Sequence, residues 1–309
     1  ADIITANTFS CQRISQADYH LEDCAREMAF EGARLARIEC DKFSTPDKPR
    51  FVAGDVGPTN KTCSMSPDVS DPAAREITYD ELFTDVCEQV DGLIEGGADV
   101  ILIETIFDTL NCKAMIDAAI TMMKKHGVVL PIMISLTVSD LAGRTLSGQT
   151  VDAFLASLSP YPIFSVGMNC AFGAPQMKPF IEHLAKVAPY YISAHPNAGL
   201  PNEMGQYDET AESMAPQIAE FIDEGIVNII GGCCGTSPEF IAHYARSAEG
   251  KKPHQVVEKP KYMWLSGLDL LQVDDSVHLP VDASRFVNVG ERCNVAGSRK
   301  FLRLINEKG

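Results

Sequence analysis

Short apolar runs alternate along the chain with longer segments whose apolar residues recur at helical spacing. This alternation is typical of βα units on a parallel sheet. The runs are rich in Val and Ile and lack strict alternation, as expected for strands that are covered on both faces. Seven such strands are predicted, at residues 2–5, 51–54, 100–104, 132–137, 164–169, 191–195 and 227–231.

The helical segments between these runs begin and end with recognisable signals. Thr78 opens a capping-box pattern, and Gly96-Gly97 follows the last apolar residue of that segment. Thr210 is expected to cap a second helix, and Pro238 is expected at the first position of a third. Each predicted strand is therefore followed by a segment that can form a helix.

Seven βα units in one direction are one short of a closed (β/α)8 barrel. We therefore expect an α/β fold of the TIM-barrel type that lacks its first strand, which would precede Ala1 in a longer chain. A doubly wound open sheet needs no eighth strand and is the structural alternative. No G-x-G-x-x-G pattern follows any predicted strand, so a dinucleotide site has little support.

The sequence pattern changes after residue 248. Residues 249–285 contain several prolines and show no sustained period, so a connecting segment is predicted there. Residues 286–290 are predicted to form a new strand, and residues 301–305 to begin a helix. The expected organisation is one domain over 1–248, a linker over 249–285 and the start of a second domain over 286–309.

Composition and charge narrow the range of partners. The 309 residues include 26 Lys and Arg against 42 Asp and Glu, which gives a formal net charge of −16. Binding to nucleic acid or to an anionic membrane needs concentrated positive charge, so neither is expected as a partner. No apolar run approaches the roughly 18 residues of a membrane span, and no signal peptide is recognisable. A cytoplasmic protein with reduced cysteines is the expectation.

Sulfur and polar side chains gather at the ends of the predicted strands, where the chemistry of a barrel collects. The fifth strand leads into Cys170, and the seventh is followed by Cys233 and Cys234. Three thiolates favour zinc over harder cations and leave a fourth position open, as in catalytic zinc sites. Glu104 and Asn197 would point to the same rim.

A set of buried cysteines without a metal is the alternative. Adjacent cysteines depart from the usual C-x2-C spacing, and neighbours on an extended strand point to opposite faces. The glycines at 231, 232 and 235 favour zinc, because a glycine-rich turn can bring both sulfurs to one metal. His195 is weighed as a ligand or an acid–base group, but a structural role is favoured.

Several motifs resemble a known family. GMNC at 167–170 and GGCCG at 231–235 resemble the zinc-dependent homocysteine methyltransferases. Longer motifs narrow the resemblance to the cobalamin-dependent methionine synthases: VGPTNKT at 56–62, IETIFDT at 103–109, GRTLSGQT at 143–150, HPNAGLPN at 195–202 and FVNVGERCNVAGS at 286–298.

This resemblance implies a different function for each part of the chain. Residues 1–248 would be a homocysteine-binding zinc barrel, and the residues from 286 on would open a folate-binding barrel. Methylcobalamin would donate the methyl group from a separate cobalamin-binding module and would be remethylated with the folate-binding module. The product would be methionine.

The resemblance also assigns roles to individual residues. Cys170, Cys233 and Cys234 would be the zinc ligands. Glu104 would receive the ammonium group of homocysteine and Asn169 would contact the substrate. Asn197 matches a residue that fills the open zinc position until homocysteine arrives.

Two alternatives to this function remain at the level of the sequence. The family's first strand carries a Gly-rich segment that contacts homocysteine, and this chain lacks it, so the chain alone is expected to be a half-reaction site or a catalytically inert zinc-binding fragment. A homocysteine methyltransferase that uses betaine or S-methylmethionine shares the cysteine motifs. It does not need a folate module, so residues 286–298 favour methionine synthase.

Overall fold

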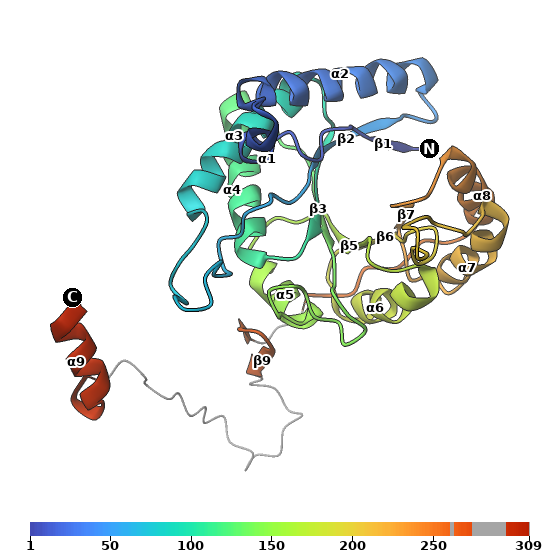
Figure 1. Ribbon diagram of the computed structural model, residues 1–309. Coiled ribbons are helices and arrows are strands. Elements are labelled where there is room, and N and C mark those ends of the chain that lie inside the picture. The colour runs from blue at the N-terminus through green and yellow to red at the C-terminus, as the bar shows by residue number, and fades with distance from the viewer. Residues whose placement is uncertain (260–262, 274–294, 309) are drawn as a thin grey trace, which may run out of the picture. The chain divides into compact units, whose positions relative to one another are not determined.

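The computed structural model describes residues 1–259, 263–273 and 295–308. The chain divides into two compact units, one formed by residues 1–260 with 265–271 and the other by residues 261–264 with 272–309. The first unit is a curled parallel sheet with helices along its outer side (Figure 1). Its strands are β1 (Ile3–Thr5), β2 (Phe51–Val56), β3 (Val100–Ile106), β4 (Ile132–Leu136), β5 (Ser165–Asn169), β6 (Tyr191–His195) and β7 (Ile229–Ile230).

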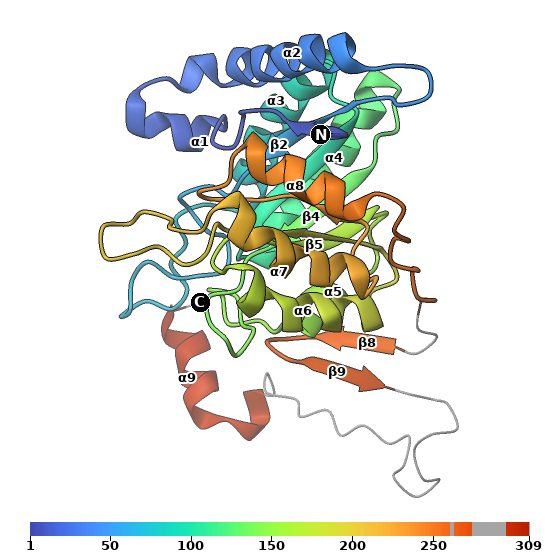
Figure 2. The ribbon, with the colours of Figure 1, turned by 90° about the vertical axis from the view of Figure 1, so that its right-hand side faces the viewer.

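Helices connect these strands and cover the convex face of the sheet, as the perpendicular view shows (Figure 2). They are α1 (Arg13–Gln16), α2 (Ala25–Phe43), α3 (Tyr79–Glu95), α4 (Thr109–His126), α5 (Val151–Leu158), α6 (Ala174–Val187), α7 (Ala211–Asp223) and α8 (Pro238–Ala248).

The strand order is β1-β2-β3-β4-β5-β6-β7, and every neighbouring pair is parallel. A doubly wound sheet would reverse its order at a switch point, so the open-sheet alternative is wrong. The fold is a TIM-barrel-like half-barrel, and the predicted succession of βα units is confirmed. Among the described residues β1 and β7 form the two edges of this sheet.

Side chains of alternate strand residues fill the concave side of the sheet. Ala53, Val100, Leu102 and Met133 form a buried cluster there, and Ile3 packs against it from the edge strand β1. A cavity of about 470 Å³ lies on this side and reaches from β1 to β7. The alternation that points Ala53 and Leu102 inward continues to the carboxyl ends of β2 and β3.

The predicted helix ends are largely confirmed. Thr78 accepts a hydrogen bond from the backbone N–H of Glu81 in a complete capping box, and Gly96 is the C-cap of α3. Thr210 caps α7 in the same way with Ser213, and Pro238 occupies the first turn of α8. These caps satisfy backbone N–H groups that the first helical turn leaves without partners.

The segment predicted as a linker without regular structure contains a hairpin. β8 (Met263–Ser266) and β9 (Leu270–Val273) pair in a two-stranded sheet across the short turn 267–269. Residues 265–271 belong to the first compact unit. The prediction rested on apolar runs separated by helical segments, whereas only three residues join the two strands of this hairpin, so the pattern gave no sign of them.

Four polar contacts hold this hairpin against the loop before α5 and its first turn. The backbone N–H of Thr150 donates to the carbonyl of Leu268 at 2.9 Å. The carbonyl of Gly267 accepts from Gln149 at 2.8 Å, Asp269 pairs with Arg144 at 2.8 Å, and Ser266 donates to the carbonyl of Ala153 at 2.7 Å. The hairpin thus completes the hydrogen bonding of the loop between β4 and α5.

The second unit contains α9 (Arg299–Lys308), which confirms the helix predicted from residue 301. The strand predicted at 286–290 lies outside the described residues. None of the helices in the described ranges is long and apolar enough to cross a bilayer.

Asp91 links three helices on the outer side of the sheet. Its carboxylate on α3 accepts hydrogen bonds from Arg26 of α2 at 2.8 Å and from Lys125 and His126 of α4 at 2.6 and 2.8 Å. Burial alone would raise the pKa of Asp91, but these hydrogen bonds hold it well below the usual range. Asp91, Glu95 and His126 lie close enough to bind a metal, but the contacts to Arg26 and Lys125 already neutralise the carboxylates.

Replacing Asp91 by asparagine is therefore expected to lower the free energy of unfolding by about 1–3 kcal/mol at pH 7. The lower end is favoured because Arg26 and Lys125 are partly solvated. The folded-state pKa is depressed, so this stabilisation is present above the unfolded-state value of about 3.9 and is lost as the pH falls below it. Urea unfolding at pH 7 and at pH 3 checks this, and an Asp91→Asn deficit of the same size at both values would contradict it.

Candidate metal centre

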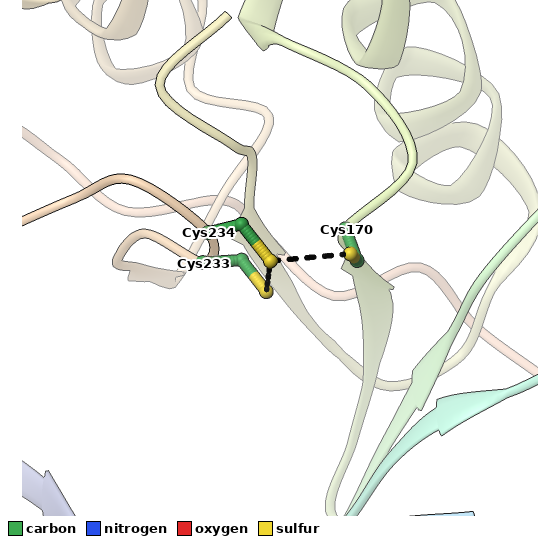
Figure 3. Close-up of side chains that lie close together, drawn as sticks. All are labelled: Cys170, Cys233 and Cys234. Atoms are coloured by element: carbon green, nitrogen blue, oxygen red, sulfur yellow. Dashed lines mark hydrogen bonds between the residues drawn. The ribbon is translucent and has the colours of Figure 1, made fainter. Parts of the chain in front are cut away.

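Two backbone segments deliver three cysteines to the carboxyl end of the sheet (Figure 3). Cys170 directly follows β5, and Cys233 and Cys234 lie in the loop between β7 and α8. Cys170 and Ala171 both adopt left-handed backbone conformations, each with φ of 61°. A non-glycine residue is strained there, and such strain is concentrated at functional sites.

The three sulfur atoms have the spacing of ligands on one metal ion. Cys170 Sγ lies 3.7 Å from Cys234 Sγ, which lies 4.0 Å from Cys233 Sγ. All three lie within 4.8 Å of one another. Tetrahedral zinc with Zn–S bonds of about 2.3 Å places its sulfur ligands about 3.8 Å apart. The donor set therefore fits Zn²⁺ and leaves one coordination position for another ligand.

The segment after β6 holds the Cys233-Cys234 turn in place. The backbone N–H of Cys233 donates to the carbonyl of Pro196 at 2.9 Å, and the N–H of Ala198 donates to the carbonyl of Cys234 at 2.8 Å. Between them, Oδ1 of the buried Asn197 accepts from the N–H of Cys234 at 3.1 Å. Asn197 thus lies beside the sulfurs, as predicted, with its side-chain oxygen engaged by the turn.

Gly235 lets the turn close against its neighbour. Its φ is +79°, and a Cβ at this position would lie 2.5 Å from Cβ of Tyr207. Tyr207 reaches Cys234 with its phenol, and burial together with this hydrogen bond raises the pKa of Tyr207 to about 12. Tyr207 is a contact of the sulfur cluster that the motif analysis did not identify.

The cluster concentrates negative charge on Cys170. A hydrogen bond from Cys233 lowers the pKa of Cys170 to about 5, with further help from the N–H of Ala171. The pKa values of Cys233 and Cys234 are raised, the first chiefly by that hydrogen bond and the second chiefly by burial. One thiolate stabilised by two thiols is suited to capture a metal that then deprotonates the others.

Asn169 connects the sulfurs to β3. Its Oδ1 accepts from the hydroxyl of Ser135 at 2.7 Å and from the N–H of Thr105 at 3.0 Å. Its Nδ2 lies 2.8 Å from Thr105 Oγ1, 3.1 Å from Glu104 Oε2 and 3.8 Å from Cys233 Sγ. The predicted site residues Glu104 and Cys233 therefore both lie within 4 Å of one amide nitrogen.

Thr105 bends β3 at this point. It has a φ of 58°, and the register of β3 against β4 shifts between Ile103 and Ile106. A β-branched residue rarely adopts this conformation, and two hydrogen bonds with Asn169 stabilise it here, one donated by the N–H of Thr105 and one accepted by its hydroxyl. The bend aims Glu104 at the rim beside the sulfurs.

Asp55 is a site residue that the sequence analysis missed. It lies on β2 beside β3, only 3% exposed, and its carboxyl group is within hydrogen-bonding reach of Glu104. The signal was present: Asp55 is a polar residue at the end of an apolar run, as Glu104 is. The predicted strand stopped at Gly54, whereas β2 continues to Val56.

His195 and the other cysteines lie outside the sulfur cluster. The backbone carbonyl of His195 accepts a hydrogen bond from the N–H of Cys170 at 3.2 Å. Burial lowers the pKa of the His195 imidazole to about 4. A neutral imidazole agrees with the favoured structural role. The nine cysteines of the described ranges are free thiols, of which Cys40 and Cys112 in helices α2 and α4 are buried and Cys24 and Cys87 are half-buried.

Solved structures of similar fold include the homocysteine methyltransferase MmuM from Escherichia coli. Its metallated form is 18% identical, with a TM-score of 0.62 over 80% of this chain and 80% of that chain. Its oxidized form is 19% identical, with a TM-score of 0.60 over 80% and 79%. At such identities the similarity establishes the fold.

The family follows from the sequence itself. Residues 1–248 match the family model described as Homocysteine S-methyltransferase, which covers most of the chain. The match spans all seven strands and the three clustered cysteines. The chain belongs to the homocysteine S-methyltransferase family.

Proposed function

We propose that this protein binds homocysteine on a zinc ion held by Cys170, Cys233 and Cys234 and activates it for methylation to methionine. The observation that carries the proposal is the sulfur spacing of 3.7 and 4.0 Å, which fits tetrahedral zinc with an open position. Family membership and the metallated form of the Escherichia coli MmuM enzyme support it.

The chemical problem is that the thiol of homocysteine is mostly protonated, and therefore a poor nucleophile, near neutral pH. When bound, Zn²⁺ would deprotonate this sulfur and keep it as a thiolate. The three cysteines make the site anionic, with a formal charge of minus one before substrate adds, so little electron density is withdrawn from the incoming sulfur.

Other residues of the chain position the substrate and the ligands. Glu104 receives the ammonium group of homocysteine, because it is the partly exposed carboxyl group beside the sulfurs. Asn169 keeps Glu104 and Cys233 at a fixed separation. Asn197 orients the Cys234 backbone, and by the family resemblance it would fill the open zinc position until homocysteine binds. Orientation of this kind lowers the entropic part of the barrier.

Methylcobalamin is the methyl donor that we favour, as in the cobalamin-dependent methionine synthases. The motifs at 56–62, 103–109, 143–150, 195–202 and 286–298 support this donor. By the family resemblance, a cobalamin-binding module would present it and a folate-binding module would take part in its remethylation. Betaine or S-methylmethionine is the alternative donor and fits the fold and the family equally. A cytoplasmic location is part of the proposal, because zinc-binding thiolates must stay reduced.

A donor comparison tests this function. The zinc-loaded protein is incubated with homocysteine and either methylcobalamin, S-methylmethionine or betaine, and methionine is measured by mass spectrometry. We expect methionine with methylcobalamin and none after zinc has been removed with a chelator.

Two other outcomes would overturn parts of the proposal. If methionine forms only with S-methylmethionine or betaine, that compound and not methylcobalamin is the methyl donor. Full zinc occupancy with no methionine from any donor would identify a zinc-binding module without turnover.

A further inference from the structure

Two carboxyl groups meet without a counter-ion at the carboxyl ends of β2 and β3. Asp55 and Glu104 lie on neighbouring parallel strands and both continue the inward face marked by Ala53 and Leu102. Their carboxyl groups are within hydrogen-bonding reach of each other. No ion pair to Asp55 or Glu104 occurs within the described ranges.

Such a pair cannot carry two negative charges in a buried position, so it holds one proton. The environments of the two groups differ. Asp55 is 3% exposed, and no hydrogen bond reaches its buried Oδ1 within the described ranges. Glu104 is partly exposed and accepts from Nδ2 of Asn169 at 3.1 Å.

This difference decides where the proton lies. A buried oxygen without a hydrogen bond is costly for a carboxylate and much cheaper for the carbonyl of a neutral acid. Burial and the charge of Glu104 raise the pKa of Asp55 well above its usual range. Burial also raises the pKa of Glu104, the hydrogen bond from Asp55 opposes that effect, and the charge of Cys170 adds to it.

We propose that Asp55 is a neutral carboxylic acid that donates a hydrogen bond to Glu104 and positions it as the ionised carboxylate for the substrate's ammonium group. Asp55 is thus a positioning residue that acts through Glu104, opposite the amide of Asn169. This inference rests on the proposed function, because it concerns the recognition of homocysteine. It adds a requirement that none of the sequence motifs contains.

Replacing Asp55 by asparagine distinguishes two candidate roles of Asp55. One is to donate a hydrogen bond to Glu104, and the other is to bind the ammonium group directly as a carboxylate. An asparagine amide donates a hydrogen bond as the neutral acid does, whereas it cannot replace a carboxylate that binds the ammonium group directly. Valine is of similar size and donates nothing. Asp55→Asn is therefore expected to bind homocysteine within about threefold of the unaltered protein, and Asp55→Val at least about tenfold more weakly.

Calorimetric titration of the zinc-loaded full chain with two thiols measures this. Homocysteine is one, and 4-sulfanylbutanoate, which lacks only the ammonium group, is the other. Asp55→Val should weaken the binding of homocysteine and leave the affinity for 4-sulfanylbutanoate unchanged. Asp85→Asn is the control, because Asp85 is also buried but binds the start of α1, and it should change neither affinity.

Three results would overturn the inference. In the first, Asp55→Asn and Asp55→Val weaken homocysteine binding equally. In the second, Asp55→Val weakens the binding of both thiols equally. In the third, neither variant changes the affinity for homocysteine. If the unaltered protein binds neither thiol, the proposed function fails instead.

An infrared measurement then still decides the state of Asp55. At pH 7 the unaltered protein should show the C=O stretching band of a protonated carboxylic acid that Asp55→Asn lacks. Absence of that band would overturn the inference without reference to any substrate.

Discussion

Replacing Cys233 by serine is expected to weaken zinc binding by at least about 100-fold. A zinc site of four ligands is stabilised by about 10–16 kcal/mol, so loss of one ligand removes roughly a quarter of that. Cys233 is an integral member of the cluster, because its sulfur lies 4.0 Å from the sulfur of Cys234 and 3.8 Å from the amide nitrogen of Asn169. Metal content after equilibration with a zinc buffer measures the change.

Cys24→Ser is the matched control, because Cys24 is a half-buried free thiol at the start of α2. It should bind zinc like the unaltered protein. X-ray absorption at the zinc edge adds a second readout, in which the number of sulfur ligands rises from three to four when homocysteine is added. Unchanged zinc content in Cys233→Ser would refute the ligand assignment.

Replacing Gly167 by alanine is expected to lower the free energy of unfolding by at least about 3 kcal/mol. Gly167 on β5 pairs with Ser193 on β6. A Cβ at Gly167 would lie 1.9 Å from the backbone oxygen of Ser193 and 2.1 Å from its hydroxyl. Both strands are buried at this point, so neither can move aside without breaking the sheet.

The same change should also weaken zinc binding, since β5 carries Cys170. Gly267→Ala is the control, because the nearest atom to its added Cβ would lie 3.9 Å away. Urea unfolding compares the two variants. Similar stabilities of Gly167→Ala and Gly267→Ala would show that the sheet accommodates a side chain between β5 and β6.

Most of the sheet was predictable because its strands are apolar on both faces and stand out from the amphipathic helices between them. The predicted strand at 191–195 coincides with β6, and that at 132–137 exceeds β4 by one residue. β7 begins two residues later than predicted and ends one residue earlier, where the chain leaves the sheet at Gly231 to form the cysteine turn. The hairpin at 263–273 was missed because no helical segment separates its two strands, unlike the strands of the large sheet.

The site was predictable in its residues but not in its conformation. Strand ends identified Cys170 and the cysteine pair, because parallel strands bring their carboxyl ends to one edge. The left-handed backbone at Thr105 is held by hydrogen bonds with Asn169, and the N–H of the left-handed Cys170 donates to the carbonyl of His195 on β6. The backbone propensities of cysteine and threonine disfavour the left-handed conformation. The sulfur spacing and the position of Glu104 therefore could not be predicted from the sequence.

The hairpin contacts place the end of the first folded unit beyond the end of the family match. The family match stops at residue 248, yet Gly267 and Leu268 supply the acceptors for Gln149 and the N–H of Thr150. A shortened protein that ends at 248 would leave both donors to water and would remove the ion-pair partner of Arg144, Asp269. Residue 269 is therefore the last one that these contacts need, and the first compact unit reaches residue 271, about two dozen residues beyond the boundary that sequence similarity marks.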